Sequence, residues 1–244
     1  AGVTSRQHAD GGLPTYNFNA GQFAASDSIS GETMTDTILT GRETCYACTV
    51  RCKRSVKTTY QDEEVDEKYG GPEYETLATF GSYCGVSDLN AVAMANQICN
   101  EYGLDTIGTG ATIAWAMECF EAGVFSTQDV GFPIPMGNAQ AMVKLTKLLA
   151  ERIDFGDVIA DGSRAAADRL GKGHEFLITV KGSETPAHMP QVKRSLGLIY
   201  AVNPFGADHN SSEHDPAVED DYKHYSDRLE SIGISDKLPT KSLE

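Results

Sequence analysis

Apolar side chains recur every three or four residues through the middle of the chain, and this period predicts a series of amphipathic helices. The clearest helix begins behind Ser87, a candidate N-cap, and ends before Gly103, where a left-handed residue is expected. Its apolar stripe consists of Leu89, Val92, Ala95, Cys99 and Tyr102. Further helices are expected over residues 109–122, 139–153 (behind Asn138 as a cap), 157–170, 195–202 and 222–232.

The first part of the chain is less periodic. Glycine, proline and asparagine interrupt residues 1–44, which we expect to form a loop-rich lead-in. One helix is expected within it, because Ser30 can cap a start and apolar residues then follow at helical spacing up to Gly41. This helix would lead the chain to Cys45.

Strand signals are sparse. The run FLITV at residues 176–180 is the only convincing strand, and the acidic stretch YQDEEVDEKYGG at residues 60–71 predicts an exposed connection. The fold class predicted is therefore mainly α, a multihelical domain with at most a few short strands. We divide the chain into the lead-in over residues 1–44, a helical domain over residues 45–215 and an acidic C-terminal segment over residues 216–244.

Composition excludes several classes of protein. A chain of 244 residues with 40% hydrophobic residues can bury a core, whereas a net charge of −15 makes nucleic acid an unfavourable partner. No apolar run reaches the roughly 20 residues of a membrane span, and the N-terminus does not have the pattern of a signal peptide. Six cysteines are too few for a disulfide-stapled secreted domain, so we expect a cytoplasmic protein. The start without Met suggests a piece of a longer protein.

Three of the cysteines are closely spaced, in the string CYACTVRC. Cys45, Cys48 and Cys52 can converge on one soft metal centre, because thiolates select iron–sulfur clusters, zinc or copper(I). On spacing alone, three ligands of a [4Fe–4S] cluster are favoured over a zinc knuckle and over an accidental clustering of thiols. A zinc site usually has a second ligand pair some 12 to 20 residues on, and no such pair occurs before Cys84.

Two features could complete a site. In GGPEYET, Glu73 and Glu75 flank Tyr74, and one carboxylate in an apolar pocket would have the raised pKa of a general acid/base, although a solvated acidic loop is the commoner outcome. In NEYGLDTIGTG, Asp105 is either a helix cap or an acceptor for a ring N–H such as that of a pterin.

A polar loop in NPFGADHNSSEHD contains His209 and His214. Histidines in such loops are usually solvated, and the spacing alone assigns them no role.

The motifs taken together are more specific than any one of them. CYACTVRC, GPEYET, GSYCGVSDLNAVAMANQICNEYGLDTIGTG, DGSRAAADRLG, VKGSETPAHMPQ and VNPFGADH follow in this order, and residues 10–215 resemble the tungsten-dependent aldehyde:ferredoxin oxidoreductase family. The resemblance implies oxidation of an aldehyde to a carboxylic acid at a tungsten, or molybdenum, bis-pterin. Electrons would leave through a [4Fe–4S] cluster to ferredoxin or another electron-transfer protein. The chain would be the helical middle domain, completed by the remaining domains of the same enzyme.

The resemblance also assigns site residues. The cluster ligands match Cys45, Cys48 and Cys52, with the fourth cysteine in a third domain beyond Glu244. Glu75 matches the active-site acid/base, His209 matches a histidine near the metal, and Tyr74 lies beside them.

A pterin-binding motif is matched in part. Gly103, Leu104 and Asp105 match the end of D-x-x-G-L-D, whereas Asn100 stands in place of the first aspartate. Two alternatives remain: a helical fragment with no cofactor and no activity of its own, and a zinc-binding structural domain. A homo-oligomer is a further possible partner arrangement of the enzyme.

Overall fold

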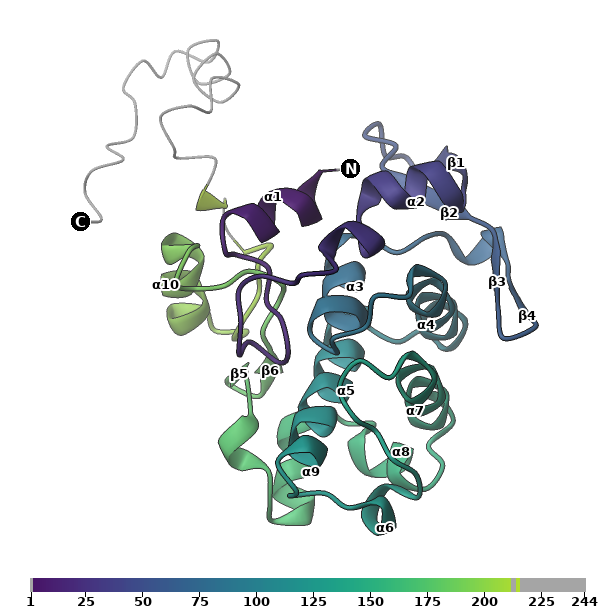
Figure 1. Cartoon of the computed structure of the whole chain (residues 1–244). Coiled ribbons are helices and arrows are strands. Elements are labelled where there is room, and N and C mark those ends of the chain that lie inside the picture. Colours follow the sequence, from purple (N-terminus) through teal and green to yellow (C-terminus); the bar gives the residue numbers. More distant parts are fainter. Residues whose placement is uncertain (1, 212–213, 216–244) are drawn as a thin grey trace, which may run out of the picture.

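The computed structural model describes residues 2–211 and 214–215, and this part of the chain is mainly helical (Figure 1), which confirms the predicted fold class. The α-helices are α1 (Val3–Ala9), α2 (Gly31–Thr37), α3 (Tyr74–Leu77), α4 (Leu89–Tyr102), α5 (Thr106–Glu121), α6 (Thr127–Val130), α7 (Ala139–Glu151), α8 (Phe155–Ile159), α9 (Ser163–Leu170) and α10 (Arg194–Val202). The helix expected over residues 222–232 and the segment 216–244 lie outside the described residues.

Short strands form three antiparallel pairs among the described residues. They are β1 (Leu39–Glu43) with β2 (Lys53–Val56), β3 (Thr58–Tyr60) with β4 (Glu63–Val65), and β5 (Thr179–Val180) with β6 (Ser183–Glu184). Short 3-10 turns are η1 (Ser26–Ile29), η2 (Glu67–Tyr69) and η4 (His174–Phe176), and one π-helical stretch is η3 (Ala78–Ser82).

The core is centred on α5. Ten of the residues of this helix are buried, and it packs against α3, η3, α7 and α9. Gly110 permits the closest of these approaches, because a Cβ atom there would lie 2.6 Å from the side chain of Thr79. Trp115 is almost fully buried, and its ring N–H donates a 2.8 Å hydrogen bond to the carbonyl of Gly173. Buried polar groups need such partners.

Helix ends follow local chemistry. The side chain of Asn138 accepts from the N–H of Ala141, and Ser30 accepts from Thr33, so both predicted caps are confirmed. Gly103 is left-handed after α4, as predicted, with φ of 71°. The cap of α4 is Asp88, one residue later than expected, and accepts from two backbone N–H groups.

Several predicted boundaries were wrong, each for a local reason. The helix from Ser30 ends at Thr37, and β1 follows, so a hairpin rather than a helix leads to the cysteines. The helix expected over 157–170 is broken at Gly162, whose φ of 99° lies outside the helical region and separates α8 from α9. The helix expected from residue 109 begins at Thr106, because Asp105 caps it.

The predicted strand and connection also differ from the structure. Of residues 176–180 only the last two are in a strand, β5, which pairs with β6. The stretch 60–71 includes β4 and η2 rather than a plain exposed connection. Both stretches form short antiparallel strand pairs, and the residues of one strand do not indicate which segment pairs with it.

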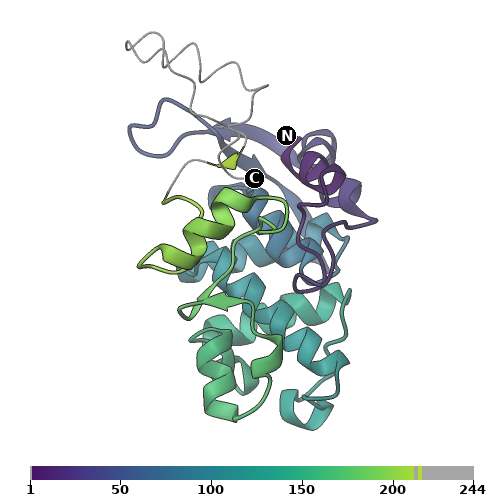
Figure 2. The same cartoon turned by 90° about the vertical axis from the view of Figure 1, so that its left-hand side faces the viewer.

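The β1–β2 hairpin lies at the end of the molecule away from α6–α9 (Figure 2). Lys53 pairs with Glu43 at the loop end of the hairpin, so the nine intervening residues form the connecting loop. Among the described helices, none combines enough length and hydrophobicity to cross a bilayer.

Replacing the cap of α4 should destabilise the fold. We expect Asp88→Ala to lower the free energy of unfolding by about 1 kcal/mol, because two N–H groups lose their acceptor. Its neighbour Ser87 is exposed, so Ser87→Ala should change stability by less than about 0.5 kcal/mol. Urea unfolding of both variants measures the difference, and equal losses would show that Asp88 is not the effective cap.

Candidate functional site

Glu75 lies at the centre of the site. It belongs to α3, a single turn that continues into η3, and the buried residues Leu77, Ala78 and Phe80 fix the face that points into the core. The Glu75 side chain is 14% exposed, and its Oε2 accepts a 2.7 Å hydrogen bond from the N–H of Ala187. Glu73 instead is exposed and forms an ion pair with Arg54. Only the second glutamate of GPEYET therefore enters the interior.

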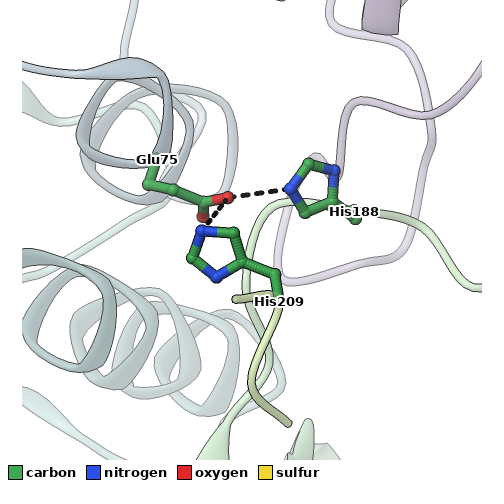
Figure 3. A group of neighbouring side chains, drawn as sticks. All are labelled: Glu75, His188 and His209. Carbon is green, nitrogen blue, oxygen red and sulfur yellow. Dashed lines mark ion pairs between the residues drawn. The ribbon is translucent and has the colours of Figure 1, made fainter. Parts of the chain in front are cut away.

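Two histidines meet the other oxygen of Glu75 (Figure 3). The Nε2 atom of His188 lies 3.0 Å from Glu75 Oε1, and the Nε2 atom of His209 lies 3.6 Å from the same oxygen. His214 completes the group, with ring centroids 4.8 Å from His188 and 5.8 Å from His209. The structure thus places His209 beside Glu75; its expected position near a metal stays a prediction.

His188 is the residue that sequence reasoning missed. It lies within VKGSETPAHMPQ, but no spacing relates it to Glu75, which is more than a hundred residues earlier. The one feature that could have indicated a role for His188 was its position inside a motif that carries the family resemblance. Its ring is buried, lies 5.8 Å from that of Tyr74, and its Nδ1 is 3.3 Å from Gln7 Nε2.

Tyr74 holds α3 in place. Its hydroxyl donates a 2.6 Å hydrogen bond to the carbonyl of Ala187, the residue whose N–H binds Glu75. Burial, and then the charge of Glu75, raises the pKa of Tyr74 well above its usual value, so the hydroxyl stays a donor. Tyr74 therefore supports the site through the backbone of the facing segment.

The environment of Glu75 favours its ionised form. Burial by itself would raise the pKa of Glu75, but the contact with His188, the charges of His188 and His209 and the N–H of Ala187 together lower it below its usual value. The pKa of Glu75 therefore shifts in the direction opposite to the raised pKa that the general acid/base alternative supposed. A carboxylate in this setting is a proton acceptor at neutral pH rather than a standing acid.

The predicted pterin motif forms the turn between α4 and α5. Gly103 ends α4, the N–H of Leu104 donates to the carbonyl of Cys99, and Asp105 Oδ2 accepts from the N–H of Gly108. Asp105 is thus a helix cap, while no hydrogen bond within the described residues uses its Oδ1. The amide of Asn100 is occupied by the carbonyl of Asn96, at 2.8 Å.

A pair of threonines connects this turn to Glu75. The Thr76 hydroxyl lies 2.8 Å from that of Thr106, and these residues directly follow Glu75 and Asp105 in the chain. The segment of Glu75 and the turn before α5 are therefore packed directly against each other.

The three clustered cysteines lie on the β1–β2 loop. Cys45 and Cys52 are exposed, Cys48 is partly exposed, and all three are free thiols. The hydroxyl of Thr44 donates to the carbonyls of Cys45 and Cys48, which folds the loop back on itself. Soft, accessible thiols fit an iron–sulfur cluster or zinc by their chemistry. Within the described residues, Glu75, His188 and His209 are the one group of three ligands whose donor atoms all lie within 4.8 Å, so the thiols are less closely gathered.

Comparison with known proteins gives consistent matches. A family model described as "Aldehyde ferredoxin oxidoreductase, domains 2 & 3" matches residues 1–240. The tungsten-containing aldehyde ferredoxin oxidoreductase of Thermococcus kodakarensis is 39% identical over 202 residues, which cover 82% of this chain and 32% of that protein. Its counterpart in Pyrococcus abyssi is 36% identical over 200 residues, covering 80% and 32%. The chain spans about a third of the length of these relatives.

A solved structure shares the fold. The active-site complex BamBC of benzoyl coenzyme A reductase, bound to 1,5-dienoyl-CoA, superposes with a TM-score of 0.63 over 83% of this chain and 31% of the matched chain. The sequence identity is 21%, so this similarity concerns the fold alone.

The two sets of cysteines should differ in reactivity. Burial raises the pKa of Cys99 and Cys119 to about 12, and raises that of Cys84 still further. An alkylating reagent at about pH 8 attacks only accessible thiolates, so it should modify the three loop cysteines in the folded chain and all six after unfolding. Peptide mass spectrometry identifies the sites. Labelling of Cys99 or Cys119 at the rate of the loop thiols would contradict this assignment.

Proposed function

Because the chain belongs to the aldehyde ferredoxin oxidoreductase family, we propose that it is part of an oxidoreductase that converts aldehydes to carboxylic acids at a tungsten, or molybdenum, bis-pterin centre. Electrons would pass through a [4Fe–4S] cluster to ferredoxin or another carrier. The observation that carries the proposal is the buried carboxylate of Glu75, fixed on one oxygen and met by two histidines on the other.

The balance of the reaction defines what the protein must do. An aldehyde and one water give a carboxylic acid, two electrons and two protons. The metal bis-pterin supplies the two-electron acceptor when bound, and an iron–sulfur cluster passes electrons on singly. The side chains of this chain would accept and remove the protons, and they would orient the aldehyde.

Glu75 is the best proton acceptor in the described part of the site. Its ionised form is favoured, and Oε1 has no regular hydrogen bond within the described residues. His188, held at 3.0 Å, would keep the carboxylate oriented and offset its charge, while His209, at 3.6 Å, is free to donate to the aldehyde oxygen as negative charge develops there. Tyr74 would fix α3 through Ala187.

The turn after α4 would contact the pterin. Asp105 Oδ1 and the open space around Gly103, where a Cβ atom would meet nothing within 4 Å, leave room for a flat ring system. Because Asn100 bonds to its own helix, it would contribute less than an aspartate at that position.

The β1–β2 loop would hold the cluster. Its three thiolates supply three of the four ligands that a [4Fe–4S] cluster requires. The fourth would come from the part of the enzyme that this chain does not span, since the relatives are about three times as long. The cluster would then join two domains, and the isolated chain would bind it weakly.

Removing the proton acceptor should reduce turnover. In the full-length enzyme, we expect Glu75→Gln to leave tungsten and iron content unchanged and to lower kcat roughly 10²- to 10⁴-fold, because the isosteric amide cannot accept a proton. Glu73→Gln, which changes the exposed neighbour, is the matched control and should retain activity. Turnover of Glu75→Gln at the level of the control would refute the role of Glu75.

Metal analysis tests the cluster. In the full-length enzyme, we expect Cys48→Ser to lose most of the cluster iron and sulfide and the associated visible absorption, because one of the thiolate ligands is lost. Cys99→Ala removes a buried thiol on α4 and should keep full iron content. Stoichiometric zinc without iron in the unsubstituted enzyme would instead support the zinc-domain alternative.

A further inference from the structure

The group around Glu75 has a property that aldehyde oxidation does not use. Glu75, His188 and His209 offer one carboxylate oxygen and two imidazole nitrogens, and these three atoms all lie within 4.8 Å of one another. We propose that these three side chains form a binding site for a divalent transition metal ion, with Zn²⁺ as the best match. The site shares Glu75 and His209 with the proposed aldehyde-oxidation site, but its argument rests on the positions of the three donor atoms and not on that chemistry.

The spacing agrees with direct coordination. Ligand bonds of about 2.0–2.2 Å in a tetrahedral arrangement place neighbouring donor atoms roughly 3.4 Å apart. The Nε2 atoms of His188 and His209 lie 3.0 Å and 3.6 Å from Glu75 Oε1, on either side of that value. Small side-chain movements would therefore suffice. Two histidines and one glutamate are also a ligand set that Zn²⁺ accepts with one position left open.

Glu75 has the acceptor capacity that a ligand needs. Its Oε2 is fixed by the N–H of Ala187, so the carboxylate cannot turn away. Its Oε1 is buried and has no regular hydrogen bond within the described residues, although His188 lies close to it. A buried, oriented and unsatisfied carboxylate oxygen is costly unless a cation or a proton donor meets it.

Gln7 provides the outer contact that metal-binding histidines usually have. Its Nε2 lies 3.3 Å from His188 Nδ1, while its own Oε1 is buried without a hydrogen-bond partner in the described residues. Turning the amide by 180° exchanges these atoms, so that the oxygen accepts the Nδ1 proton of His188. The lone pair of Nε2 then faces Glu75, as ligation requires. The change satisfies Gln7 Oε1 directly, whereas Glu75 Oε1 is satisfied only when a cation lies between it and the lone pair of His188.

Occupation of the site would have a chemical consequence. A metal ion on Glu75 Oε1 takes the oxygen that the proposed reaction needs as proton acceptor. Zn²⁺ bound there would therefore inhibit rather than support aldehyde oxidation.

Co²⁺ serves as the probe, because it replaces Zn²⁺ and absorbs visible light. The loop thiols also bind metals, so the parent is the 244-residue chain with Cys45, Cys48 and Cys52 all changed to Ser. We expect saturable binding of about one Co²⁺ per chain, without thiolate charge-transfer absorption and reversed by Zn²⁺. Glu75→Gln should weaken Co²⁺ binding at least tenfold, and Gln7→Ala should weaken it roughly 10- to 100-fold.

The control is His174→Ala, since His174 is exposed and pairs with Asp168 away from the site; its Co²⁺ affinity should equal that of the parent. Circular dichroism confirms that each variant is folded, and the isosteric Glu75→Gln change is the deciding test. No Co²⁺ binding, or binding that Glu75→Gln leaves unchanged, would overturn the site. The turnover of Glu75→Gln in the full-length enzyme is a separate measurement, so either proposal can fail alone.

Discussion

Three hydrogen bonds between residues 74–83 and the segment 185–187 hold the site together. The hydroxyls of Tyr74 and Tyr83 donate to the carbonyls of Ala187 and Thr185, and the N–H of Ala187 donates to Glu75. Each joins residues more than a hundred positions apart. Without them, the carboxylate of Glu75 would be a poorly compensated charge in the interior, and such a charge is strongly destabilising. The same contacts bring His188, the next residue, up to Glu75.

Helix caps and helix ends could be predicted from the sequence, because each depends on one short segment. Asn138 caps its helix by its own side chain, and Gly103 ends the preceding helix because it adopts a left-handed conformation. Features that depend on contacts between residues far apart in the sequence could not be predicted. The spacing of Glu73 and Glu75 cannot show which one faces the core, and nothing in the sequence around His188 indicates that it meets Glu75. Two-residue strands such as β5 likewise depend on a partner that a run of residues does not reveal.

The six cysteines fall into a buried set and a set on the β1–β2 loop. Cys84, Cys99 and Cys119 behave as small apolar core residues, and burial keeps them protonated. The loop cysteines share their surface with Tyr46, which is fully exposed, and with Val50, which is 73% exposed. Exposure of large hydrophobic side chains to water on the loop that carries the thiols is unfavourable. Their placement makes physical sense if the loop is covered by the remaining two thirds of a protein of the relatives' length.

The geometry of Glu75 permits two chemical roles that exclude each other. One oxygen is fixed by a backbone N–H, so the other keeps a constant direction and an unused lone pair. A proton acceptor needs this arrangement, and so does a metal ligand. Which role is realised depends on His188, because its Nε2 either carries a proton towards Glu75 or offers a lone pair. Gln7 would favour one of these states through the atom that it presents to Nδ1. On the proposed metal site, the orientation of one buried amide would therefore bias the site towards moving protons or towards binding a cation.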